Sequence, residues 1–265
     1  MGIFFSHIIP SYFQWWHLPI VFLAGLVGEG YGVVVGSGGV LIQFVLLSLG
    51  IPLPIVVATD IAGCLGSNVG VITASQKHIW TNKKLLVIVG VPFFIGGVIG
   101  TFFLTKISPN LLSYVVICGL FLLLIYIAFG KKATVQAVHK ISIRPKQIPL
   151  LSSTMVALGL YGNVSGIGVG TFQKISYSSL LKISIADGIG ITNIVGLPPT
   201  AFSFVATTIA GLIAWPYLIM LWLGNFIGSH LIAKQIRKIP NKYLQVFLIL
   251  VTLLYLIYLI WSLIH

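Results

Sequence analysis

Long apolar runs separated by short polar segments dominate the chain. Six of the runs have the length that a membrane-spanning helix needs, about 20 residues. They are 56–75, 85–105, 111–129, 187–209, 213–233 and 243–262. Two further segments, 18–55 and 150–182, are longer than one span, and glycine interrupts each near its middle. The pattern predicts an all-α fold, a polytopic transmembrane helical bundle with about 8–10 passes.

The composition supports a membrane protein. Of the 265 residues, 58% are apolar and 7% are charged, whereas soluble proteins carry about 25% charged residues. No Lys or Arg precedes the first apolar run within 1–17. Because a cleaved signal peptide begins with a basic region, we expect this first segment to remain in the mature protein.

The chain contains two copies of one pattern. The segment GLVGEGYGVVVG begins at Gly25, and GLYGNVSGIGVG begins at Gly159. At one constant offset, four glycines of the first segment coincide with glycines of the second. The pairs are Gly25 with Gly159, Gly28 with Gly162, Gly32 with Gly166, and Gly36 with Gly170. Later in each copy come an Asp, an Asn and a Pro-Asn pair in the same order. We therefore expect an internal duplication.

The duplication sets the expected domain organisation. It divides the chain into a first transmembrane repeat (1–130), a basic linker (131–147) and a second transmembrane repeat (148–265). Each repeat would contain three full spans plus a glycine-broken hairpin or re-entrant segment.

Basic residues predict the orientation. If each glycine-broken segment crosses the membrane once, the Lys and Arg residues divide almost equally between the two sides. If each crosses and returns, every Lys and Arg except Lys106 falls on one side, as the positive-inside rule requires. The second arrangement gives the repeats inverted topology, with the linker in the cytoplasm and both termini outside the cell membrane.

The glycine breaks are candidate anion sites. Transporters with inverted repeats bind substrate near the midplane, where broken helices meet, and free amides at a helix N-terminus attract anions. The candidates are Gly36, Ser37, Gly38 and Gly39 in the first copy, and Gly168, Val169, Gly170 and Thr171 in the second. Alternatively, Gly28, Gly32 and Gly36 form a small-residue face for close helix packing, and both interpretations can hold together.

Three acids, Glu29, Asp60 and Asp187, are the only ones in the chain, and all fall in or near apolar stretches. An intramembrane carboxyl group is a functional candidate by default. Asp60 and Asp187 occupy equivalent places at the expected start of a span. They either couple transport to protons, because burial favours the protonated form, or cap the helices that they open. Glu29 has only Asn163 as its counterpart.

Neutral and basic side chains complete the candidate site. Asn68 and Asn193, together with Ser67, Thr192 and Gln76, offer uncharged donors to an oxyanion. Polar residues of this kind also hold transmembrane helices together. Lys174 and Lys182 follow the second glycine break. They either guide an anion inward or, as we expect, are ordinary bases of the cytoplasmic face.

Several classes of protein are excluded. The net charge of +12 arises from loop bases, without the aromatic interleaving of single-strand nucleic-acid binders. The two cysteines, Cys64 and Cys118, form no metal or redox motif. No P-loop, catalytic triad or cofactor fingerprint is present. We therefore expect no enzyme, no cofactor, no metal and no nucleic-acid partner.

The motifs resemble those of a known family. The run Gly36-Ser37-Gly38-Gly39 with the later Pro52, and the second run from Gly159 to Gly170, are similar to the TauE/SafE sulfite exporter family. Asp60 and Asp187 stand where that family has a Gly-Thr-Ser sequence. The resemblance covers the chain from Gly25 to Leu263 and implies transport of sulfite or small organosulfonate or carboxylate anions, with protons.

The leading hypothesis is a secondary anion transporter with alternating access at a midplane site. A cation channel, or a cation-coupled carrier that uses the buried acids as ligands, is the alternative. A third possibility is a membrane scaffold that transports nothing. The expected partners are a small anion, protons and the lipid bilayer, and the expected oligomeric state is a monomer or a homodimer.

Overall fold

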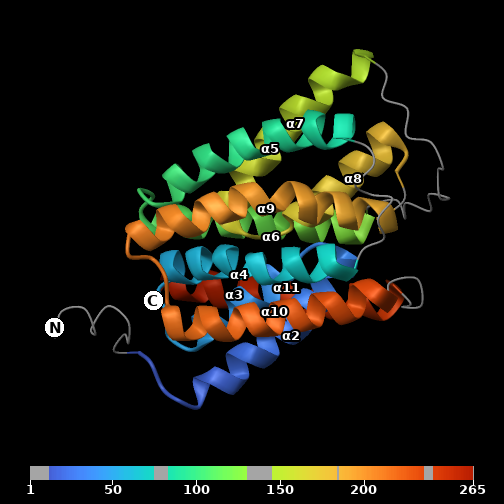
Figure 1. The fold of residues 1–265 in the computed structure, drawn as a ribbon. Coiled ribbons are helices and arrows are strands. Elements are labelled where there is room, and N and C mark those ends of the chain that lie inside the picture. The colour runs from blue at the N-terminus through green and yellow to red at the C-terminus, as the bar shows by residue number, and fades with distance from the viewer. Residues whose placement is uncertain (1–11, 75–82, 130–144, 184, 236–240, 265) are drawn as a thin grey trace.

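The computed structural model describes residues 12–74, 83–129, 145–183, 185–235 and 241–264. The side chains of 128–129, 185–187 and 241–245 lie outside that description. The described residues are helical, with short turns and no strand (Figure 1). In the first half of the chain the helices are α2 (His17–Val35), α3 (Gly39–Ser48), α4 (Leu53–Ala74), α5 (Lys83–Leu104) and α6 (Pro109–Phe129).

The second half repeats this order of long and short helices. After the short 3₁₀ helix η2 (Pro145–Gln147) come α7 (Ile148–Ser165), α8 (Val169–Leu181), α9 (Ile185–Ile209), α10 (Trp215–Gln235) and α11 (Asn241–Ile264). The six expected full spans are confirmed as α4, α5, α6, α9, α10 and α11. With α2, they make seven described helices that are long and apolar enough to cross a bilayer.

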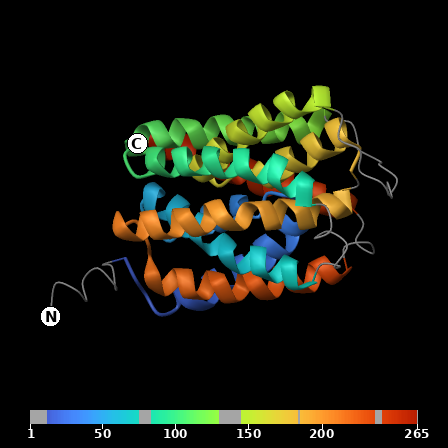
Figure 2. The same cartoon turned by 45° about the horizontal axis from the view of Figure 1, so that its top comes forward.

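Both glycine-broken segments form helical hairpins. In the first, α2 ends at Gly36, whose φ of 91° is left-handed, and α3 begins at Gly39. In the second, α7 ends at Gly166, with a φ of 70°, and α8 begins at Val169. The two hairpins enter the bundle from opposite ends, so that their tips approach each other in its interior (Figures 1 and 2).

Each half covers the other. Helix α10 of the second half packs on α2 and α4, and α5 of the first half packs on α7 and α9 (Figure 2). Helices α4 and α9 lie against each other between these groups. Two hydrogen bonds join α10 to α4. The Asn225 side-chain amide donates to the Gly63 carbonyl at 2.9 Å, and Trp222 Nε1 donates to the Ala62 carbonyl at 2.9 Å.

Small residues let the backbones cross closely. A Cβ atom on Gly228 of α10 would overlap the Leu26 carbonyl of α2, and one on Gly100 of α5 would overlap the Leu160 carbonyl of α7. Gly25 and Gly159, the first glycines of the two repeated segments, lie in the same two crossings and face α10 and α5. Bilayer helices gain little from hydrophobic association, so close van der Waals contact stabilises such crossings.

The surface and the interior have the polarity of a membrane protein. Large apolar side chains face outward, among them Phe103 (57% exposed), Tyr114 (58%) and Leu254 (54%). Polar side chains such as Gln43 and Asn225 are fully buried. A soluble domain would show the reverse distribution, and lipid is the medium that accommodates the outer face.

Two sequence-based expectations are wrong. Asp60 is not a helix cap, because α4 begins at Leu53 and Asp60 lies within the helix, fully buried. Lys174 is not a base of the cytoplasmic face, because it lies inside α8 and is only 7% exposed. Helix α8 begins so deep in the bundle that its second turn remains in the interior. Lys182, at the end of the same helix, is exposed as expected.

We predict that Gly96→Ala in α5 destabilises the protein by about 1–3 kcal/mol, the usual cost of overpacking. A Cβ atom at this position would overlap the Val156 carbonyl of α7, and backbone cannot move aside as a side chain can. The melting temperature in detergent measures the effect. Gly90→Ala on the same helix is the matched control, because its nearest neighbour, Val195, would lie at 3.7 Å. Equal melting temperatures for the two variants would contradict the close crossing.

We also predict that Gly36→Ala costs more stability than Gly50→Ala. Both glycines have a left-handed φ, 91° and 81°, so both substitutions carry the same backbone strain. Only Gly36 faces another segment, since its Cβ atom would overlap the Thr171 amide, whereas nothing lies within 4 Å of one on Gly50. The difference between the two melting temperatures therefore isolates the contact between the hairpin tips. No difference would mean that the tips do not touch.

Candidate functional site

The hairpin tips are joined by hydrogen bonds from one half of the chain to the other. At the end of α2, the Gly36 carbonyl accepts from the Thr171 amide at 3.0 Å, and the Val35 carbonyl accepts from Thr171 Oγ1 at 2.7 Å. Lys174 Nζ donates to the Val33 carbonyl at 2.7 Å. The last carbonyls of a helix have no partner within it, so α8 supplies the C-terminal cap of α2.

The reciprocal cap is made by Gln43 of α3. Its Nε2 donates to the Ser165 carbonyl at the end of α7, at 2.8 Å, and also to Asp60 Oδ2 at 2.8 Å. Tyr255 of α11 donates its hydroxyl to Gln43 Oε1 at 3.1 Å. Each hairpin thus satisfies a helix end of the other, and Asp60 is held against the first tip.

A cavity of about 120 Å³ lies between the hairpins, α4 and α9. Most of the predicted substrate-binding residues line it. These are Gly36, Ser37, Gly38, Gly39, Asn68, Gly170 and Asn193, with the acid Glu29 beside them. Thr171 does not line the cavity, because its side chain is engaged with Val35. Asp60 lies behind Gly39 and Gly166, and the side chain of Asp187 is outside the described residues.

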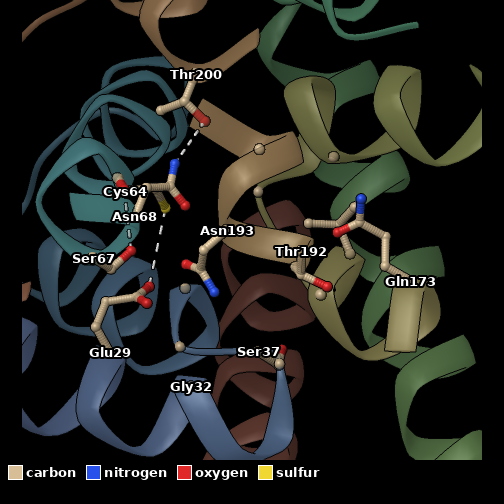
Figure 3. A pocket seen from close by; sticks show the side chains of 18 of the residues that line it. Glu29, Gly32, Ser37, Cys64, Ser67, Asn68, Gln173, Thr192, Asn193 and Thr200 are labelled. Carbon is tan, nitrogen blue, oxygen red and sulfur yellow. Dashed lines mark hydrogen bonds between the residues drawn. The ribbon is translucent and has the colours of Figure 1, made fainter. Parts of the chain in front are cut away.

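Several polar groups in the cavity wall have no hydrogen-bond partner among the described residues. They are Ser37 Oγ, Asn163 Oδ1, Gln173 Nε2 and Thr192 Oγ1, all buried. Figure 3 shows Glu29, Ser67 and Asn68 on one side, Gln173 and Thr192 on the other, and Asn193 between them. A buried polar group without a partner costs free energy. Three of the four can donate, so an acceptor in the cavity would satisfy them.

Asparagine side chains support the wall as well as facing the cavity. Asn193 Nδ2 donates to the Ile189 carbonyl at 2.8 Å, and Asn163 Nδ2 donates to the Gly159 carbonyl at 3.0 Å. Asn68 Nδ2 lies 3.5 Å from Thr200 Oγ1 and joins α4 to α9. These amides therefore have the structural role that polar residues often have between transmembrane helices.

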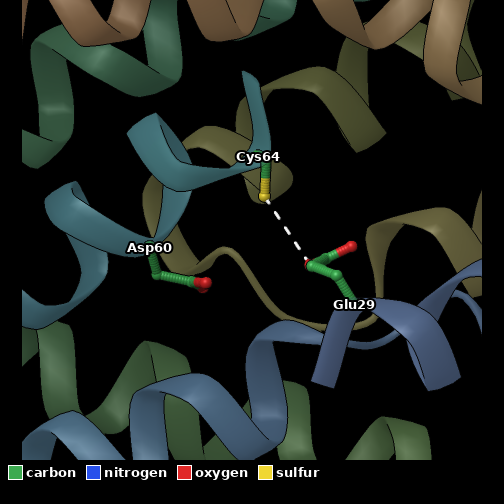
Figure 4. Close-up of side chains that lie close together, drawn as sticks. All are labelled: Glu29, Asp60 and Cys64. Atoms are coloured by element: carbon green, nitrogen blue, oxygen red, sulfur yellow. Dashed lines mark hydrogen bonds between the residues drawn. The ribbon is translucent and has the colours of Figure 1, made fainter. Parts of the chain in front are cut away.

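Glu29, Asp60 and Cys64 form a compact set of donor atoms (Figure 4). One ligand atom from each lies within 4.8 Å of the other two. The Cys64 thiol points at Glu29 Oε1 across 4.0 Å, and Asp60 Oδ1 has no partner among the described residues. Two carboxyl groups this close cannot both be charged in an apolar interior without a cation or a shared proton. The set could therefore hold a proton or a metal cation. The sequence patterns did not indicate that Cys64 takes part in such a site.

The sequence patterns did not indicate Gln173, and for Lys174 they favoured a place on the cytoplasmic face over a role in guiding the anion. Helical spacing carried a signal for Lys174, because the buried face of α8 includes Gly170, Tyr177 and Ser178 at three- and four-residue intervals. Lys174 falls on that face. The local sequence nevertheless favours a base of the cytoplasmic face, because a Lys beside a glycine break resembles a residue at the end of a span.

The comparisons with known proteins agree with this architecture. A probable membrane transporter protein from Sinorhizobium is 21% identical over 89% of each chain. A probable membrane transporter protein from Haemophilus influenzae is 20% identical over 83% of this chain and 85% of its own. No solved structure matches significantly.

The family model for the sulfite exporter TauE/SafE matches residues 20–259 and so covers both hairpins and all the long helices. These relatives are membrane transporters and not enzymes. The chain therefore belongs to the TauE/SafE sulfite exporter family of multi-pass membrane transporters.

Proposed function

We propose that the protein is a secondary transporter of a small anion, either sulfite or a small organosulfonate or carboxylate. The observation that carries this proposal is the cavity between the hairpin tips. Its wall presents buried donors that lack partners, from Ser37, Gln173 and Thr192. An oxyanion has several acceptor oxygens and no need of donors, so it fits such a wall.

The hairpin geometry supports substrate binding at mid-depth with alternating access. The short helices α3 and α8 begin at the tips, and the positive ends of their dipoles lie in the interior of the bundle. Irregular backbone inside a membrane is tolerated where it lines a cavity. Rocking of one hairpin group against the other would expose this cavity to one side at a time.

We infer that the two halves are inverted copies. The packing is reciprocal, since α2 crosses α10 as α7 crosses α5. Exposed bases lie at the first residue of α5 (Lys83), just before α7 (Lys146) and in the last turn of α10 (Lys234), and these helix ends are at one end of the bundle (Figure 1). Lys106 lies in the turn between α5 and α6, which is at the other end. By the positive-inside rule the first end is cytoplasmic. The domain boundaries at 1–130, 131–147 and 148–265 follow from this duplication.

Proton coupling is the second part of the proposal. Asp60 is fully buried, accepts one hydrogen bond from Gln43, and lies next to Glu29 in the acidic set. Proton uptake would relieve the repulsion between the two carboxyl groups. Asp187 stays a candidate for the same role on the basis of its place in the second copy.

The donor set of Glu29, Asp60 and Cys64 favours one alternative, a carrier that uses a metal cation in place of the proton. Oxygen ligands from carboxyl groups suit monovalent and divalent cations, and a thiol adds affinity for softer metals. In that case a cation gradient, and not a pH gradient, would drive the anion.

We predict that Asp60→Asn abolishes the dependence of anion transport on a pH gradient and lowers the driven flux by about tenfold or more. The amide cannot exchange a proton but keeps the size of the side chain. Uptake of radiolabelled sulfite into proteoliposomes, with and without an imposed pH gradient, measures both effects. Asp60→Glu is the control that retains a carboxyl group.

Repeating that measurement with a sodium gradient and equal pH on both sides tests the cation alternative. Wild-type uptake that follows sodium would favour it. Full, pH-driven transport by Asp60→Asn would refute the role of Asp60 in proton coupling.

The orientation predicts the labelling of single cysteines. Ser108→Cys, in the turn between α5 and α6, should react with a membrane-impermeant maleimide added to intact cells, whereas Lys146→Cys should react only after permeabilisation. The unmodified chain is the control for Cys64 and Cys118. The reverse pattern would refute the proposed orientation. Labelling of both positions in intact cells would refute the assignment of positions 108 and 146 to opposite sides of the membrane.

A further inference from the structure

Lys174 stands out because a lysine ammonium inside a membrane bundle must be compensated. It is 7% exposed and is the only basic residue among the described residues that line the cavity. Its Nζ donates to main-chain carbonyls of α2, at 2.7 Å to Val33 and 3.4 Å to Val34. No described acid lies within ion-pair distance of it, although Glu29 interacts with it electrostatically over a longer range.

Capping a helix end does not require a charge. The equivalent cap at the end of α7 is made by Gln43, which is neutral. Thr171 already donates twice to the end of α2, through its amide and its hydroxyl. A charged group at this depth costs free energy that a glutamine in its place would avoid. The ammonium therefore has a use that carbonyl groups alone do not explain.

The cavity wall near Lys174 contains three donors that have no partner among the described residues. They are Nε2 of Gln173, its neighbour in α8, and the hydroxyl groups of Ser37 and Thr192. These three residues and Lys174 line one cavity of about 120 Å³. An ammonium has three donors, and a bond to an anionic oxygen is about twice as strong as one to a neutral carbonyl.

The charges of the site also limit the ligand. One ammonium can neutralise one negative charge, while the acid Glu29 lines the same cavity and Asp60 lies close to Glu29. A doubly charged ion would retain an uncompensated charge close to these carboxyl groups, which is costly in a medium of low dielectric constant. The site therefore matches a singly charged oxyanion, such as hydrogensulfite or a monosulfonate.

We propose that Lys174 binds the charge of a singly charged oxyanion in the cavity, and that it leaves the α2 carbonyls when it does so. The inference rests on the proposed anion transport and adds the residue and the charge class to it. Because the same ammonium caps α2, binding of the anion removes part of the contact between the hairpin tips. Binding of the substrate is thereby linked to the contact between the two hairpin tips, which must open during transport.

The test measures binding of methanesulfonate, a permanent monoanion, to the purified full-length protein by isothermal titration calorimetry. We predict that Lys174→Gln weakens binding by about 10- to 100-fold, as the loss of a hydrogen bond to a charged group does. Lys182→Gln, at the exposed end of the same helix, is the matched control and should bind as the wild type does. Sulfate, a dianion, should bind the wild type at least about tenfold more weakly than methanesulfonate.

Hydrogen exchange of the wild-type peptide that contains Thr171 reports the contact between the tips. Saturating methanesulfonate should speed exchange of this amide, and should not do so in Lys174→Gln. Unchanged affinity in Lys174→Gln, or equal affinity of the wild type for sulfate, would overturn the proposal. Slower or unchanged exchange in the wild type would overturn the release of α2. If Lys174→Gln fails to fold, the sulfate comparison and the wild-type exchange still decide the outcome.

A measurement of anion flux across liposomes tests the proposed transport separately from the proposed role of Lys174. Wild-type protein that binds methanesulfonate but carries no anion across liposomes would refute transport and leave the binding role of Lys174 standing. Transport by the wild type with unaltered binding and flux in Lys174→Gln would refute only the inference. A wild type that binds neither methanesulfonate nor sulfite would refute both.

Discussion

Every main-chain polar group inside a membrane needs a partner, and this constraint governs the centre of the structure. A helix that stops halfway leaves carbonyls exposed to a medium that cannot solvate them. Helices α2 and α7 both stop there, and each is capped by a side chain from the opposite hairpin, Lys174 for α2 and Gln43 for α7. The cavity exists because the two broken segments must meet.

The polar chemistry of the site follows from the same requirement. Gln43 satisfies Ser165 and, with its second hydrogen, Asp60. Thr171 is used for capping, which removes it from the cavity wall, while Ser37 stays free to face the cavity. Groups that cap the helix ends and groups that line the cavity therefore come from the same two tips, and Lys174 belongs to both sets. A movement that separates the tips changes both sets together.

Much of the fold could be predicted from the sequence, because span length and glycine breaks are local features. The six long spans and the two folded-back segments are found where the apolar runs indicated them. The cavity unites glycines from both copies with Asn68 and Asn193, as the midplane rule for broken helices suggested. The two wrong expectations, for Asp60 and Lys174, concern how deep each residue lies in the bundle. An Asp early in an apolar run resembles a cap, yet α4 begins at Leu53, two turns before Asp60.

The depth of Lys174 in the membrane is equally hard to predict from its local sequence. A Lys beside a glycine break has the local sequence of a span end, and only the position of α8 within the bundle places it in the interior. Cys64 belongs to no metal or redox motif in the sequence, but its neighbours in space are acids from α2 and from its own helix. The surroundings of Lys174 and of Cys64 both depend on contacts between segments that are distant in the sequence, and a single sequence does not show such contacts directly.

The exchange of caps between the halves has a consequence for biogenesis. The ribosome delivers the described helices α2 to α6 before the second hairpin exists, so the end of α2 emerges with no group to cap it and with no α10 to cover Gly25. Uncapped carbonyls at that depth cost several kcal/mol in lipid. The end of α2 therefore reaches its partners in the finished fold only after the second hairpin has been synthesised.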